Sequence, residues 1–397
     1  IASVVMDYPH AVIDSVLPSS GEALPVNWAL EDPRDYTAVL EYLTPALCRE
    51  AGIKKEQIVG IGIDFTCCTV LPIKKDGTPL VSLPEFDKNK HAYVKLWKHH
   101  GATEESDEIT ALAAARGEAW LSAYGGTVSC EWMLPKILET LRKAPAMFKA
   151  AHRFMEAADW LSLLLTGRET HAAAFAGYKG LWHGGQYPSD EFLSALDPAL
   201  KGLIGGKISP RVDPVGGVAG RLNGRGAALT GLPEGTPVAL PMIDAHAALP
   251  ALGMTRAGDL TVILGTSTCH ILNAAEAREV TGICGYVQDG VIPSLCTYEA
   301  GQASFGDAFD WFVKNLVPEH YCTEARKKGI SVHKLLREKA QKQSIGEHGL
   351  VALDWFNGNR CPLSDFNLSG AILGLTLTTR PEEIYRALLE SASFATA

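Results

Sequence analysis

Apolar positions along the first part of the chain predict one amphipathic helix followed by strands. Residues 33–51 carry apolar residues at helical spacing, which predicts a helix with one buried face. These residues are Tyr36, Val39, Leu40, Leu43 and Leu47. Residues 57–64 form an apolar run typical of a buried parallel strand. Residues 70–81 predict a hairpin that turns at Asp76-Gly77.

The middle of the chain is mainly helical in pattern and ends in a segment rich in turns. Helical spacing dominates from about residue 93 to residue 165, with a break near the Gly125-Gly126 pair. Residues 202–235 are rich in glycine and proline, which favours a change of domain there. A chain of 397 residues exceeds one simple core. We therefore expect two domains, residues 1–230 and 231–397.

Strands and helices alternate in the second half, which indicates an α/β domain with a mixed sheet. The pattern predicts strands over 236–243, 259–264, 268–272 and 294–298, and helices over 245–252 and 304–316. A further helix is expected over 379–397, where Thr379 and Glu382 form a capping box and no stop signal follows. Because the chain also opens on strand-like residues, we expect both domains to be incomplete at its ends.

Charge and cysteine usage exclude several classes of protein. The net charge is −9 and no run of Lys and Arg stands out, which argues against a nucleic-acid partner. The nine cysteines are scattered and form no CxxC pair, so we expect reduced thiols, a cytoplasmic protein and no structural zinc. We see no signal peptide and no apolar stretch long enough to span a bilayer. A small-molecule substrate fits this composition better than a polymer or a membrane.

Four polar positions could carry chemistry, and each has a plain structural alternative. Asp244 follows an apolar strand and starts a helix, so it is either a helix N-cap or a general base at a strand end. The turn Gly265-Thr266-Ser267 is either an ordinary hairpin turn or a set of N–H and hydroxyl donors for phosphate. Lys179 and Glu299, taken alone, are typical of solvated surface residues. Residues alone leave these alternatives open.

Short segments in order along the chain resemble the FGGY family of carbohydrate kinases and, within it, the bacterial ribulokinases. The matching segments are 62–66, 96–100, 131–132, 159–160, 176–179, 244–246, 265–269, 282–285, 299–302 and 353–358. The resemblance implies the actin/Hsp70-like ATPase fold. In that fold, two RNase H-like α/β domains have a cleft between them.

The same resemblance implies an activity and a set of site residues. It implies ATP- and Mg²⁺-dependent phosphorylation of ribulose at its C5 hydroxyl, as in arabinose and pentose catabolism. Asp244 would be the general base, and no residue is assigned as a metal ligand. The residues implied to contact the sugar are Cys67, Lys179, Asp244 and Glu299. Those implied to hold the nucleotide are Gly265, Thr266, Gly306 and Asp310.

One feature separates the subfamilies of this family, and one departure from its pattern keeps alternatives open. Glycerol kinases carry an Arg-Glu pair where this chain has Cys67-Cys68, so the resemblance disfavours glycerol as the substrate. The family's first phosphate hairpin, with its Asp-x-Gly-Thr turn, is expected before Ile1 and is not in this sequence. The alternatives are another FGGY sugar or polyol kinase, for xylulose or ribitol, and a non-catalytic sugar-binding remnant. Assembly is open, with a homodimer as one alternative.

Overall fold

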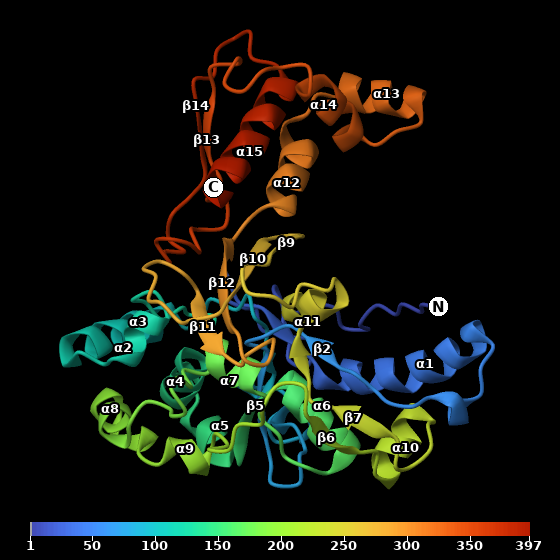
Figure 1. Ribbon diagram of the computed structural model, residues 1–397, viewed down its shortest axis with the longest axis vertical. Helices are drawn as coiled ribbons and strands as arrows, with labels where there is room; N and C mark the ends of the chain where they lie inside the picture. Colours follow the sequence, from blue (N-terminus) through green and yellow to red (C-terminus); the bar gives the residue numbers. More distant parts are fainter. Residues whose placement is uncertain (1) are drawn as a thin grey trace. The chain divides into compact units, whose positions relative to one another are not determined.

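A computed structural model describes residues 2–397, whose contacts divide the chain into two compact units (Figure 1). Unit 1 contains the chain up to Thr255 together with residues 275–277 and 286–297. Unit 2 contains residues 256–274, 278–285 and 298–397. We describe each unit by itself.

Unit 1 is an α/β structure in which short strands alternate with helices. Its helices are α1 (Pro33–Ala51), α2 (Thr103–Arg116), α3 (Trp120–Ala123), α4 (Met133–Lys143), α5 (Pro145–Ala150), α6 (Ala157–Thr166), α7 (Ala173–Lys179), α8 (Asp190–Leu196), α9 (Leu203–Gly206), α10 (Gly224–Thr230) and α11 (Asp244–Ala251). Its strands are β1 (Leu30–Glu31), β2 (Asp64–Phe65), β3 (Val70–Ile73), β4 (Val94–Lys95), β5 (Arg153–Glu156), β6 (Val218–Arg221), β7 (Pro237–Ala239) and β8 (Met242–Ile243), followed by most of β11 (Gly285–Gln288) and the start of β12 (Cys296–Gln302).

The main sheet of unit 1 has the order β1-β4-β3-β5, and all its pairings are antiparallel. One core of the unit is formed by residues from α1, α6 and this sheet, including Tyr36, Leu71 and Trp160. The predicted helix over 33–51 is confirmed as α1. Asp32 caps its first turn, and Gly52 ends it in the left-handed conformation (φ +63°), which glycine adopts without a steric cost.

The predicted strand over 57–64 is only partly correct. Regular pairing is limited to β2, which runs parallel to β8 with Asp64 opposite Met242. A single parallel bridge joins Ile61 to Val238. The parallel direction is confirmed, but burial is not, because Val59 is 89% exposed. Among the described residues this run pairs along one edge only, so some of its apolar side chains face solvent.

Residues 231–255 pack with unit 1 because their strands pair with earlier ones. β7 is antiparallel to β6, and β8 is parallel to β2. The segment rich in glycine and proline, which suggested a boundary at 230/231, itself forms β6, α10 and the turns around them. The contacts divide the chain after Thr255. The extent of the two folding domains stays a prediction.

Unit 2 combines a β-hairpin with a helical layer. Its elements are β9 (Leu260–Leu264), β10 (Thr268–Ala274), the rest of β12, α12 (Gly306–Leu316), α13 (Glu319–Lys328), α14 (Val332–Ala340), β13 (Val351–Leu353), β14 (Ala371–Leu373) and α15 (Pro381–Thr396). β9 and β10 pair antiparallel from Leu264 and Thr268 outward, which confirms the predicted hairpin. Phe312, Leu336 and Leu388 join α12, α14 and α15 in one core.

Candidate functional site

Asp244 lies where β8 gives way to α11. Ile243 occupies the N-cap position and makes no side-chain cap, so Asp244 is the first helical residue and not the N-cap. The Asp244 side chain is exposed, and its Oδ1 accepts a hydrogen bond from the backbone N–H of Ala245 at 2.7 Å. The C-terminal end of a parallel strand is where ligands bind in α/β sheets. The structure thus presents a carboxylate at the position expected for a catalytic base.

Packing of α7 against α11 brings Lys179 into the region of Asp244. Tyr178 and His246 meet edge to face with ring centroids 4.5 Å apart. The Tyr178 hydroxyl donates to the carbonyl of Thr297 at 2.7 Å, which fixes the end of α7. Lys179 is the next residue and the last of that helix.

Lys179 is buried, so the alternative of a solvated surface lysine is wrong. Its side chain is 8% exposed, and Nζ lies 5.7 Å from the centre of the Trp132 ring. A cation over an aromatic face is attracted by the quadrupole of the ring. The Tyr124 hydroxyl donates to the carbonyl of Gly177 at 2.5 Å, which holds the helix from its other side. This lysine is therefore held in place by aromatic residues.

Cys67 lies in the turn that joins β2 to β3. Because Phe65 is opposite Ile243 in the parallel pair, this turn begins beside Asp244. Burial raises the pKa of the Cys67 thiol well above its ordinary value, and the charge of Lys179 acts in the opposite direction. Cys67 is therefore a neutral thiol near an ammonium group. The structure places Cys67, Lys179 and Asp244 on neighbouring elements of unit 1.

Two buried charged residues that contact this turn were missed from the sequence. Lys136 donates to the carbonyl of Cys68, and Glu156 accepts from the backbone N–H groups of Cys68 and Thr69. Each is a single charge in an apolar run, Met133–Leu138 and Phe154–Ala158 respectively. That interruption is the only signal in the sequence, because the partners lie 68 and 88 positions away.

In unit 2 the turn after β9 contacts the start of α12 through the backbone. The N–H of Phe305 donates to the carbonyl of Thr266 at 2.8 Å, and the N–H of Gly306 donates to that of Gly265 at 3.0 Å. A Cβ at Gly306 would lie 2.6 Å from the Gly265 oxygen, so only glycine fits at that position. Gly265, Thr266 and Gly306 thus lie together. Asp310 lies one helical turn further along α12.

Glu299 lies on β12 in unit 2, whereas Cys67, Lys179 and Asp244 belong to unit 1. It is 7% exposed, so it is not the solvated surface acid of the alternative interpretation. Its backbone carbonyl accepts from the N–H of Cys284 at 2.9 Å. Its predicted contact with the sugar stays a prediction.

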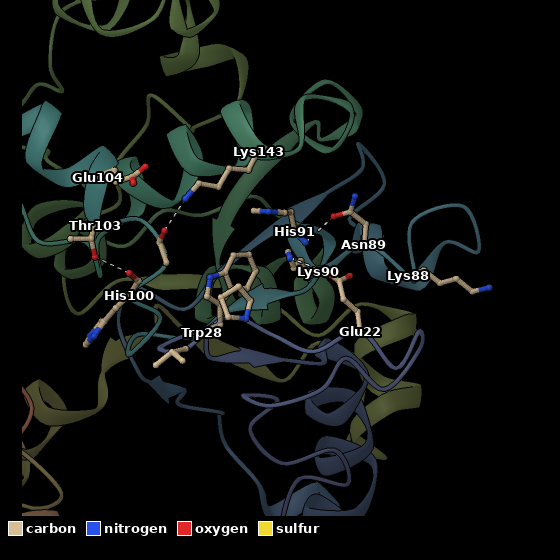
Figure 2. Close-up of a pocket in the computed structure, with 13 residues that line it drawn as sticks. Glu22, Trp28, Lys88, Asn89, Lys90, His91, His100, Thr103, Glu104 and Lys143 are labelled. Atoms are coloured by element: carbon tan, nitrogen blue, oxygen red, sulfur yellow. Dashed lines mark hydrogen bonds and ion pairs between the residues drawn. The ribbon is translucent and has the colours of Figure 1, made fainter.

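A cavity of about 730 Å³ opens elsewhere in unit 1 (Figure 2). Its walls include Trp28, Lys90 and His91, and Lys90 lies 5.1 Å above the Trp28 ring while pairing with Glu22 at 2.8 Å. None of the eight predicted site residues lines this cavity. It is separate from the candidate site.

Among residues 2–397, no group of three or more His, Cys, Asp or Glu side chains is arranged to hold a metal ion. In the same part of the chain, no helix is both long and apolar enough to cross a membrane. The adjacent His99 and His100 instead contact carboxylates, at 3.1 Å from Glu139 and 3.2 Å from Glu131.

Comparison with solved structures identifies the class of protein. The chain matches the xylulose kinase from Rhodospirillum rubrum with a TM-score of 0.75 and 26% identity, over 94% of this chain and 70% of that one. The gluconate kinase from Lactobacillus acidophilus matches with a TM-score of 0.75 and 17% identity, over 99% and 71%. The predicted fold class, α/β with two RNase H-like domains of the actin-like ATPase type, is confirmed. The fold is that of the sugar kinases.

Comparison with protein families and relatives identifies the family. Residues 18–251 match the N-terminal domain of the FGGY family of carbohydrate kinases, and residues 260–397 match its C-terminal domain. The chain is 46% identical to the ribulokinase of Bacillus licheniformis and 47% identical to that of Geobacillus thermodenitrificans. Both matches cover the whole chain and, respectively, 72% and 70% of the relative. This chain belongs to the FGGY family of carbohydrate kinases.

Proposed function

We propose that this protein transfers the γ-phosphoryl group of ATP to the C5 hydroxyl of ribulose and forms ribulose 5-phosphate. The observation that carries the proposal is the placement of Cys67, Lys179 and Asp244 on neighbouring elements of unit 1. Identities of 46–47% over the whole chain to two ribulokinases support the same substrate.

Each of the three residues has a role that its surroundings support. The Asp244 carboxylate is exposed at a strand end, where it can take the proton of a substrate hydroxyl as the phosphoryl group is transferred. Lys179 is held against Trp132, so its ammonium would donate hydrogen bonds to a sugar from a fixed position. Cys67 is a small neutral thiol, which leaves room for a five-carbon sugar and does not act as a nucleophile.

The residues of unit 2 fit a nucleotide phosphate. Gly265 and Gly306 allow a close backbone approach, and the Thr266 hydroxyl is a donor of the kind that phosphate oxygens accept. When bound, Mg²⁺ neutralises phosphate charge, and it is commonly held by the phosphates, water and one or two carboxylates. Asp310 is the carboxylate we assign to the nucleotide side, and Glu299 the one that contacts the sugar.

The cellular location, partners and oligomeric state of the protein stay predictions. We infer that it acts in the cytoplasm on a small-molecule sugar, without nucleic-acid or membrane partners. A homodimer remains a proposal that sedimentation of the purified protein tests.

A substrate panel tests the proposed function. ADP release is measured with ATP and Mg²⁺ against D-ribulose, L-ribulose, D-xylulose, ribitol and glycerol, with kcat/KM as the readout. We expect a ribulose to be the best substrate by at least tenfold, because the sugar-side residues are those of the ribulokinase pattern.

Two other outcomes would overturn that assignment. A higher kcat/KM for xylulose or ribitol favours another FGGY kinase, the alternative suggested by the match to the R. rubrum xylulose kinase at 26% identity. Absence of turnover with every sugar, together with measurable ribulose binding by calorimetry, favours the non-catalytic remnant.

A further inference from the structure

The turn that carries Cys67 has an unusual backbone conformation at the next residue. Cys68 has φ +61°, in the left-handed region that side chains other than glycine and asparagine rarely adopt. The hydroxyls of Thr66 and Thr69 lie 2.7 Å apart and close the turn. A cysteine in this conformation persists only where its surroundings hold it there.

Glu156 holds the N–H side of the turn. Its Oε1 accepts from the Cys68 N–H at 3.2 Å and its Oε2 from the Thr69 N–H at 3.0 Å. The carboxyl group is fully buried and comes from the last residue of β5, which pairs with Val70 of β3. Strand pairing therefore places this acceptor directly behind the turn.

Lys136 holds the carbonyl side. Its Nζ donates to the Cys68 oxygen at 2.6 Å and to the Leu96 oxygen at 2.8 Å, and the residue is 1% exposed. A lysine is almost never this buried unless it has partners. The carbonyl of Cys68 accepts a hydrogen bond from Lys136 while its N–H donates one to the Glu156 carboxyl group, so two buried side chains hold the same residue from both sides.

We propose that Lys136 and Glu156 are positioning residues of the sugar site. They hold Cys68 in the left-handed conformation and thereby fix Cys67 beside Lys179. Both residues are buried and hydrogen-bond to the backbone of the turn, so both act through the turn. This inference rests on the proposed function, because it assigns the turn to sugar binding, and it adds two residues to that site.

Lys136→Met tests the carbonyl side, because methionine has a similar length and lacks the ammonium. We expect KM for ribulose to rise about tenfold while KM for ATP and kcat change by less than about twofold, the pattern of lost substrate binding. A purely structural role would lower stability without this selective change. An unchanged KM for ribulose, or an equal rise for ATP, would overturn the proposal.

A rescue variant separates positioning from general damage. Adding Cys68→Gly to Lys136→Met should return KM for ribulose to within about threefold of the wild type, because glycine adopts the left-handed conformation without help. Lys207→Met is the matched control. Its ammonium also donates to a backbone carbonyl, that of Ala151 at 2.6 Å, and lies over the Phe148 ring, both outside the turn. The control should lose stability and keep KM; failure of the rescue contradicts the inference.

Amide hydrogen exchange tests the N–H side without relying on activity. In Glu156→Gln we expect exchange at Cys68 and Thr69 to speed up at least tenfold, while Leu71 in the β3–β5 pairing keeps its rate. Unchanged exchange at both amides would overturn the inference. If the wild type phosphorylates no pentulose, the proposed function fails, and this measurement still reports whether the turn is held as described.

Discussion

The sugar-side residues of unit 1 and the phosphate turn of unit 2 are held in place by different means. In unit 1, aromatic rings position Lys179, and the buried side chains of Lys136 and Glu156 hold the backbone of Cys68. In unit 2, backbone hydrogen bonds and the absence of a side chain at Gly306 bring the turn and the helix together. We therefore expect function in unit 1 to be impaired by the loss of a charged group, and function in unit 2 by a larger side chain at a glycine position.

The largest effect is expected at the exposed carboxylate of unit 1. Asp244→Asn should lower kcat by about 10²- to 10⁴-fold, because an amide cannot take the hydroxyl proton. Ribulose binding, measured by calorimetry, should stay within about threefold. Asp64→Asn is the matched control, since Asp64 is also exposed and lies at the same strand pair. Full turnover in Asp244→Asn would refute its role as the base.

The second largest effect is expected at Gly306, where the structure leaves no room for a side chain. Gly306→Ala places a Cβ 2.6 Å from the Gly265 oxygen, so the turn and the helix must move apart. We expect KM for ATP to rise about tenfold or more while KM for ribulose changes little, since misplacement of a ligand-holding group is costly. Gly206→Ala is the control, because a Cβ there meets no atom within 4 Å. A normal KM for ATP in Gly306→Ala would contradict the assignment of this turn.

The difference between the units also explains what could be predicted from the sequence. Local patterns sufficed for α1, for the hairpin at 259–272 and for α12, because each buries one face of a regular element. The glycines of unit 2 lie within recognisable turns. By contrast, β5 was not predicted, because it lies within residues whose apolar spacing is typical of helices. Val59 belongs to an apolar run that predicts a buried strand, yet it is exposed.

The candidate site was predictable only where a motif marks it. Asp244, Lys179 and Glu299 were found through a family resemblance, since alone each matched a plainer structural role. Lys136 and Glu156 were missed because burial of a charge depends on partners that are remote in sequence. The spacing of apolar residues carries no information about such partners, so the contacts that hold the turn could be seen only in the structure.

A smaller, pH-dependent effect tests the buried charge in unit 1. Burial raises the pKa of Glu156 from 4.5 to about 7, with Lys136 and His171 opposing the rise and Asp159 adding to it. Because the folded-state pKa lies above the unfolded one, the stability that protonation contributes is present below pH 4.5 and lost as pH rises through 7.

The unfolding free energy of the wild type should therefore fall relative to Glu156→Gln by roughly 2–3 kcal/mol between pH 5 and 8. Urea denaturation at each pH measures the difference. A gap between the two proteins that does not change with pH would show that Glu156 does not titrate in this range.

The smallest effect is expected at the exposed acid of unit 2. Asp310 pairs with Lys314 at 2.5 Å, but the two side chains are 49% and 69% exposed, so the pair should contribute less than about 0.5 kcal/mol to stability. Asp310→Asn should leave the melting temperature nearly unchanged and raise KM for ATP about two- to fivefold if the acid acts on the nucleotide side.

Lys314→Met breaks the same ion pair while keeping the carboxylate, so it separates the two contributions of Asp310. A rise in KM for ATP in Asp310→Asn alone assigns the acid to the nucleotide. Equal changes in both variants mean that the ion pair only supports α12, and no change in either removes Asp310 from the site. In that last case, the nucleotide side of unit 2 would depend on backbone geometry at Gly265, Thr266 and Gly306 alone, which makes the contrast with unit 1 sharper.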